Sequence, residues 1–256
     1  LDNRPGRTWR PLQDAADAAQ ILYGARPDWE SYRRTVDYYD EGNLIWLDVD
    51  GIIREQTRGK KSMDDFCRAF HGGSDTPPLM KPYTLEDVVR TLNEVAPYDW
   101  AGYLNGRLTS LDARAPLSGL ERAGWRLTYR DTLDEMERDF EEVRKVTDLS
   151  FSLGATLNEE GTLIDVIPGS PLAKAGLSPG MMLIAVDGKV YTRLMIRDAI
   201  RLAAKSSAPT MIIARNGDFV STYRVDYHGG ERYPYLERIT SRPDMLKAII
   251  SSKAEK

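Results

Sequence analysis

The stretch from Tyr38 to Arg54 constrains the fold most, because two adjacent tyrosines lead into a long apolar run. A helix that is apolar on nearly every side is a buried one. Asp50 and Arg54 stand four residues apart with the acid first, which is the better order for a helical ion pair. The sequence therefore predicts a central buried helix. Tyr38 and Tyr39 stand at its N-terminal end, either as hydroxyls at the edge of a cleft or as half-buried packing rings.

Composition narrows the class of protein. The chain has 256 residues, 41% of them hydrophobic and 29% charged, which is typical of one large or two ordinary globular domains. A formal net charge of -4 argues against non-specific binding to nucleic acid. No apolar run approaches the roughly 20 residues that a membrane span needs. A single cysteine, Cys67, excludes an internal disulfide.

The first residue is Leu1 and not Met, so we expect a processed chain or a fragment with a truncated N-terminus. No signal peptide is visible, and a truncation could have removed one. The sequence leaves the compartment open between periplasm and cytoplasm.

Residues 1–115 are predicted to be all-helical. The first ten residues are interpreted as a solvated loop that carries Arg4, Arg7 and Arg10, with the alternative that these arginines bind acidic groups. Apolar residues then recur at three- and four-residue spacing, as on a helix face. Ser62 and Thr84 each precede a carboxylate three residues on, the pattern of a capping box at the start of a helix.

Residues 116–147 are interpreted as a connector. Residues 125–129 alternate as a strand does, and residues 131–144 form a charged helix with one apolar stripe. We expect this helix to pack on one of the flanking domains or on both.

Residues 148–227 are predicted to form a small β-sandwich or barrel of short strands with two helices. Leu149, Phe151 and Leu153 alternate like a strand, and Asp187-Gly188 is a strong hairpin signal. Residues 228–256 are a tail that ends in a short helix. The chain as a whole is therefore predicted to be an α+β multidomain protein.

Several motifs in the helical region occur together. They are Pro5-Gly6-Arg7, Leu12-Gln13-Asp14, Asp37-Tyr38-Tyr39 with Gly42, Leu47-Asp48-Val49-Asp50 with Ile53-Arg54, and Ser62-Met63-Asp64-Asp65-Phe66. In combination they resemble the glycyl aminopeptidase family, zinc metallopeptidases of the gluzincin type, in the part that follows the zinc site. The resemblance implies that residues 1–115 are the C-terminal part of a peptidase catalytic domain.

The zinc motif of that family, His-Glu-x-x-His, does not occur in this chain. The histidines are His71 and His228, and both are interpreted as loop residues without a partner ligand. We therefore predict no metal site and no cofactor in this chain, and no peptide hydrolysis by the chain alone. The resemblance implies zinc in the full-length parent protein.

The same resemblance assigns a role to one tyrosine. In such enzymes a tyrosine donates a hydrogen bond to the oxyanion of the tetrahedral intermediate. Tyr39 lies three residues before Gly42 and matches the Tyr-x-x-Gly pattern of the wider superfamily, with Tyr38 as the alternative. The family often has a lysine where Glu41 stands here.

The later segments 167–177 and 179–188 resemble the signature of a PDZ domain. Leu153-Gly154-Ala155 matches its carboxylate-binding loop, whose backbone N–H groups hold a peptide C-terminus while the peptide adds a strand. Ile196 and Ile200 would belong to the helix that forms the groove wall. The alternative is a groove that is closed, or filled by the chain's own tail.

Two functions follow from these resemblances. The first is the C-terminal part of a zinc-dependent aminopeptidase-like protein, whose PDZ module binds peptide C-termini or regulates substrate access. Its partners would be a peptide or protein substrate and the N-terminal remainder of the catalytic domain. The alternative is a non-catalytic binding or scaffold protein that acts through the PDZ groove alone.

Overall fold

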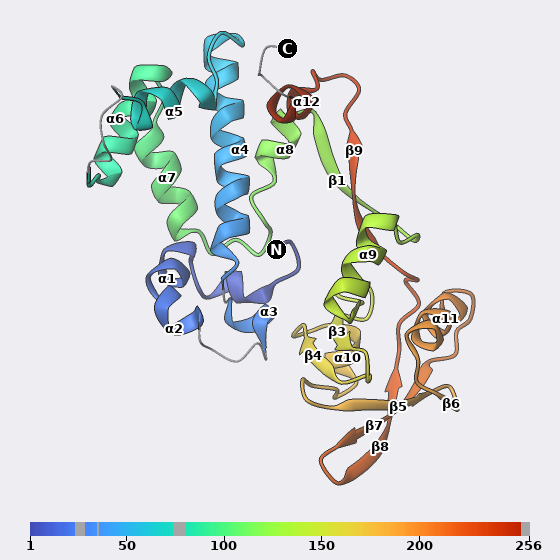
Figure 1. Ribbon diagram of the computed structural model, residues 1–256. Coiled ribbons are helices and arrows are strands. Elements are labelled where there is room, and N and C mark those ends of the chain that lie inside the picture. The colour runs from blue at the N-terminus through green and yellow to red at the C-terminus, as the bar shows by residue number, and fades with distance from the viewer. Residues whose placement is uncertain (24–28, 35, 74–79, 252–256) are drawn as a thin grey trace.

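The computed structural model describes residues 1–23, 29–34, 36–73 and 80–251. Figure 1 shows a helical region (α1 to α8), a β-rich module, and a long ribbon with helix α9 that joins the two. Helix and sheet are thus mixed, as an α+β protein requires.

Within its described part, the predicted all-helical region is helical. Its elements are η1 (Pro5–Thr8), α1 (Leu12–Asp17), α2 (Ala19–Tyr23), α3 (Glu30–Arg33), α4 (Tyr38–Thr57), α5 (Met63–His71), α6 (Leu85–Val95) and α7 (Trp100–Thr109). Both predicted capping boxes are present, at Ser62 for α5 and at Thr84 for α6. His71 is the last residue of α5, so its prediction as a loop residue was wrong.

Helix α4 is the centre of the helical core. It was predicted to be buried on nearly every side, but one of its sides is exposed. Ile45, Val49 and Ile53 point into a core shared with α1, α5, α6 and α7. Trp46 and Tyr39 lie on the exposed side of the same helix. The Asp50–Arg54 ion pair was predicted correctly and joins Oδ2 and Nε at 2.7 Å.

A further helix, α8 (Ser118–Arg122), packs closely against α4. A Cβ added at Gly119 would lie 2.6 Å from the backbone nitrogen of Asp48, so the two backbones approach each other directly. The start of the segment interpreted as a connector therefore contacts the helical region.

The connector strand pairs with the tail. Strand β1 (Trp125–Arg130) runs antiparallel to β9 (Tyr233–Arg238), with Trp125 opposite Arg238 and Arg130 opposite Tyr233. Helix α9 (Glu135–Arg144) follows β1, and α12 (Met245–Ile250) follows β9. The ribbon thus brings together two segments that are far apart in the sequence (Figure 1).

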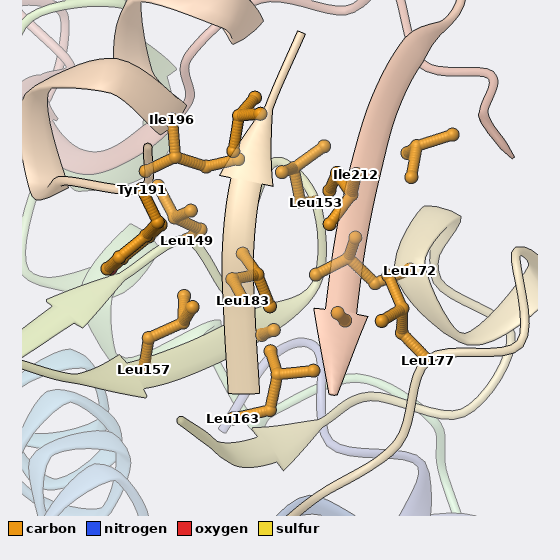
Figure 2. Close-up of a cluster of buried hydrophobic side chains, with 14 of the residues drawn as sticks. Leu149, Leu153, Leu157, Leu163, Leu172, Leu177, Leu183, Tyr191, Ile196 and Ile212 are labelled. Atoms are coloured by element: carbon orange, nitrogen blue, oxygen red, sulfur yellow. The ribbon is translucent and has the colours of Figure 1, made fainter. Parts of the chain in front are cut away.

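The β-rich module contains two sheets. Its elements are β2 (Val146–Asp148), β3 (Ala155–Asn158), β4 (Leu163–Val166), α10 (Pro171–Lys174), β5 (Met182–Val186), β6 (Lys189–Val190), α11 (Arg193–Ala203), β7 (Thr210–Asn216) and β8 (Phe219–Val225). The strand orders are β2-β3-β4 and β6-β5-β7-β8. One apolar core lies between them, with Leu157, Leu163 and Ile212 among its members (Figure 2). The described strands form open sheets and not a closed barrel.

Local turn signals in the module were predicted with mixed success. Asp187 and Gly188 have φ of 47° and 76° and join β5 to β6, as the hairpin signal requires. The strand predicted from the alternation of Leu149, Phe151 and Leu153 is instead a turn between β2 and β3. Leu149 N closes this turn by donating to Ala155 O at 2.9 Å, and the two buried leucines sit at its ends.

Among the described helices, none is long and apolar enough to cross a membrane.

Candidate functional site

The first turn of α4 places the two candidate tyrosines differently. Tyr38 is half-buried and packs against the helical core, whereas Tyr39 is 59% exposed. Their ring centroids lie 4.6 Å apart, yet successive residues on a helix point about 100° away from each other. Only Tyr39 therefore presents its side chain mainly to the outside of this region.

A buried cluster of four charged side chains holds that first turn. Arg7 and Arg34 both donate to the carboxylate of Glu41. Arg34 Nε also donates to Asp37 Oδ2 at 3.1 Å. All four side chains are almost fully buried, and buried charges persist only when they are paired. The cluster thus fixes the orientation of α4 from its first turn.

This arrangement corrects one prediction and gives Glu41 a structural role. Arg7 is buried and ion-paired, so its prediction as a solvated loop residue was wrong. Arg34 Nη1 further donates to the carbonyl of Arg10 at 2.9 Å, tying the first ten residues to α4. Glu41 is a structural partner of two arginines and points inward, away from Tyr39.

A polar cavity of about 260 Å³ lies beside this cluster. It is lined by Arg7, Glu41, Arg107, Ser110, Asp112, Ala113, Arg114, Ala115 and Pro116. Three of these side chains are arginines and two are acids, so the cavity has a slight excess of positive charge.

A second polar centre lies on the next turns of α4. The buried carboxylate of Asp48 accepts hydrogen bonds from four side chains. These are Tyr103 Oη at 2.9 Å, Arg107 Nη2 at 3.1 Å, Ser118 Oγ at 2.6 Å and Arg122 Nε at 2.9 Å. Burial raises the pKa of Tyr103, and the negative charge of Asp48 raises it further. Asp48 therefore joins α4 to α7 and α8.

The described residues provide no metal site. No group of three or more His, Cys, Asp or Glu side chains in the described part of the chain is placed to hold a metal ion. His228 lies instead between the Ala203 carbonyl, at 2.8 Å from Nδ1, and Asp226 Oδ1, at 2.9 Å from Nε2. The hydrogen bond to the carbonyl raises the pKa of His228, and the bond to Asp226 adds to this shift. The described residues do not fit a zinc ion.

The structure brings the predicted groove residues together in the core of the module. Leu153 on the loop, Ala155 at the start of β3, and Ile196 and Ile200 on α11 are all buried in the same cluster. Figure 2 labels Leu153 and Ile196 of this set. Gly154 has a φ of +79°, and a Cβ there would lie 2.1 Å from Cβ of Ser170. The loop therefore needs glycine for two reasons, its backbone conformation and the close approach of the start of α10.

Comparison with known proteins gives one structural likeness of note. No family model matches the chain, and no curated protein matches it. A solved structure of an aminopeptidase N family protein from Idiomarina loihiensis matches 98% of this chain and 44% of its own length, with a TM-score of 0.58 and 17% identity. A HtrA3 PDZ domain bound to a phage-derived ligand matches 44% of this chain and 92% of its own length, with a TM-score of 0.22 and 14% identity.

At 17% identity, the likeness to the Idiomarina protein shows a shared fold and nothing more specific. This chain spans less than half of that protein's length, and the match runs through both the helical region and the β-rich module.

Proposed function

We propose that this chain is the C-terminal part of an aminopeptidase-like enzyme. In this proposal the helical region is one wall of a catalytic site, and Tyr39 supplies a hydrogen-bond donor to it. The fold likeness to an aminopeptidase N family protein supports the proposal, as do the motifs around Asp37-Tyr38-Tyr39 and Gly42. The remainder of the catalytic domain is then the partner that covers the exposed first turn of α4.

The observation that carries the proposal is an exposed tyrosine on a rigidly held helix end. Tyr39 is 59% exposed, while Glu41 two residues on is locked between Arg7 and Arg34. A donor contributes most to catalysis when it is already aimed at the place where charge develops, and the buried ion cluster provides this preorganisation. A phenol hydroxyl is a donor of the required kind.

The metal chemistry belongs outside this chain in the proposal. The described residues do not fit zinc, so zinc expected in the full-length parent would be held by residues of its N-terminal remainder. The parent's substrate would be a peptide or a protein, and the β-rich module would regulate access to the site or bind peptide C-termini. No contact in the described residues favours the alternative of a pure scaffold protein.

The proposal is tested by Tyr39→Phe in a protein that joins this chain to its catalytic remainder. Turnover should fall about 10²–10³-fold, with KM within a few-fold, because the hydroxyl acts on charge that develops in the transition state. Thermal stability should barely change, since the exposed ring and its packing remain.

Tyr38→Phe is the matched control, because its neighbouring ring packs against the helical core. A loss of turnover in Tyr38→Phe with normal turnover in Tyr39→Phe would move the role to Tyr38. If neither change affects turnover, the two tyrosines are packing residues, and the catalytic proposal for this helix end is wrong.

A further inference from the structure

Both edges of strand β3 are already paired. On one side β4 lies antiparallel to it, with Ala155 opposite Val166. On the other side β2 lies antiparallel to it, with Val146 opposite Asn158 and Asp148 opposite Thr156. A peptide that adds a strand to a sheet needs a free edge with unpaired backbone groups. The chain's own strand β2 occupies that place.

The residue that follows β2, Leu149, is held by the loop that precedes β3. The carbonyl oxygen of Leu149 accepts hydrogen bonds from the loop N–H groups of Ser152, at 3.1 Å, and Gly154, at 2.8 Å. Its side chain is 1% exposed and lies in one cluster with Leu153 and Ile196 (Figure 2). The N–H donors and the apolar pocket that a peptide C-terminus would need are therefore both in use.

Side chains along this segment alternate between the module and solvent. Thr147 and Leu149 are buried, while Asp148 between them is exposed. Alternate side chains of an added strand enter pockets on the same side, because the side-chain period of a strand is two. The segment from Val146 to Leu149 thus has the burial pattern of a bound peptide.

An ion pair holds this segment against α11. The carboxylate of Glu141 on α9 accepts two hydrogen bonds from Arg197 Nη2 on α11, at 2.7 and 2.9 Å. Glu141 Oε1 also accepts from the backbone N–H of Asp148 at 2.8 Å. Glu141 and Arg197 are both buried, and Arg197 also donates to the hydroxyl of Tyr233 on β9. Glu141 therefore ties α9 to both α11 and the segment.

We propose that Val146–Leu149 is a built-in ligand that occupies the module's own peptide groove. This segment excludes peptides whose last residue is apolar and carries a free C-terminal carboxylate. Such peptides bind only when β2 leaves β3, and in the closed state the groove serves to hold α9 in place. The inference goes beyond the proposed function, because Tyr39 and the helical region take no part in it.

The test uses the whole chain and a labelled peptide with the sequence of residues 144–149 and a free carboxylate at its last leucine. Because Leu149 and Ala155 form a hydrogen-bonded pair, the alternation of the ladder makes Thr147 and Leu157 the next such pair. Thr147→Pro removes an N–H from this pair and displaces β2. Thr147→Val keeps the N–H and nearly the same volume, and is the matched control.

Fluorescence anisotropy should show no saturable binding to the unaltered chain or to Thr147→Val below about 1 mM. Thr147→Pro should bind at least about tenfold more tightly, and an amidated peptide should bind more weakly than the free acid, because a carboxylate is the stronger hydrogen-bond acceptor. Saturable binding to the unaltered chain would overturn the proposal. So would a folded Thr147→Pro chain that leaves the free-acid peptide unbound.

Hydrogen exchange on the unaltered chain decides the question if Thr147→Pro does not fold. The amides of Thr147, Ser152 and Gly154 should exchange far more slowly than exposed loop amides, because their exchange requires β2 and Leu149 to leave the groove. Exchange of these amides at the rate of exposed loop amides would show an open groove and would contradict the proposal.

Discussion

The carboxylate of Asp48 on α4 links this helix to α7 and α8. It is buried, and its four hydrogen-bond donors come from α7 and α8. The sequence places Asp48 among apolar residues, where a charge is costly unless its partners are fixed. Of the two acids in this run, Asp50 has Arg54 four residues on, whereas Asp48 has no such local partner. That difference is a signal that could have identified this centre, but the partners of Asp48 lie more than 50 residues away.

Asp48→Ala should lower the free energy of unfolding by about 3–5 kcal/mol, because it leaves Arg107 and Arg122 without their shared partner. Urea denaturation followed by circular dichroism measures this change. Glu55→Ala is the control, because Glu55 binds the same Arg122 but is exposed, and it should cost less than about 1 kcal/mol. Equal losses in the two variants would show that Asp48 acts only as another surface partner of Arg122.

At the scale of elements, β2 is the strand that the sequence did not reveal. The predicted module began at residue 148, within β2 and before a strand expected at Leu149 to Leu153. In the structure the module's three-stranded sheet begins at Val146, and Leu149 contributes a buried side chain to its core. In the structure, β2 and the residue after it therefore add to the sheet and to the core of the module.

A segment of residues 145–227 should fold cooperatively, whereas residues 150–227 should be much less stable. The shorter segment loses the burial of Leu149, worth about 1.5–3 kcal/mol, and the hydrogen bonds to its carbonyl. Thermal melts and amide spectra of the two segments provide the comparison. Equal stability would mean that β2 adds nothing to the module.

At the scale of the whole molecule, the helical region and the module meet at Ser31 and Asp165. The backbone N–H of Ser31 donates to Asp165 Oδ2 at 3.2 Å, and its hydroxyl donates to the same oxygen. Asn3 Nδ2 adds a second contact by donating to the carbonyl of Ser150 at 3.0 Å. Burial raises the pKa of Asp165 despite the two bonds from Ser31, which act to lower it.

This raised pKa makes the folded state bind a proton more readily than the unfolded chain does. The ionised carboxylate of Asp165 therefore opposes folding. The opposition is absent below the unfolded pKa and grows as the pH rises through the folded pKa. Asp165→Asn keeps an acceptor for Ser31 and cannot ionise, so it should make the chain more stable at pH 7.

Denaturation curves of Asp165→Asn and the unaltered chain should converge when the pH falls below about 4, where both side chains are neutral. Ser31→Ala is the opposite control and should destabilise the chain at pH 7, because it removes a donor to the ionised carboxylate. A stability difference between Asp165→Asn and the unaltered chain that stays constant with pH would exclude the titration of Asp165 as its cause.

Local signals predicted much of this fold, and long-range packing decided the rest. The capping boxes at Ser62 and Thr84 and the hairpin at Asp187-Gly188 depend on neighbours within a few residues, and all three are present. Arg7 can be buried because it pairs with Glu41, which lies 34 residues further along the chain. The periodicity of the sequence cannot reveal so distant a partner.

The candidate sites show the same difference between local signals, which the sequence contains, and long-range packing, which it does not reveal. The motif placed the tyrosine pair at the start of a helix, but only the packing of Tyr38 distinguishes the two rings. For the groove, the sequence predicted the loop and the helix wall, with the alternative of a groove that is closed or filled by the chain's own tail. The occupant is the preceding strand β2 and not the tail, because Leu149 can reach the loop N–H groups through a short turn.

The ribbon of β1 and β9 makes the β-rich module an insertion. Arg130 and Tyr233 stand opposite each other, so residues 131–232 leave the ribbon and return to it at adjacent points. Two chain connections restrict rotation of the module more than one connection would. After a single backbone cleavage within residues 131–232, each fragment is still joined to one strand of the ribbon. A short turn between Arg130 and Tyr233 would close the same ribbon, so the pairing of β1 with β9 does not itself depend on the module that lies between them.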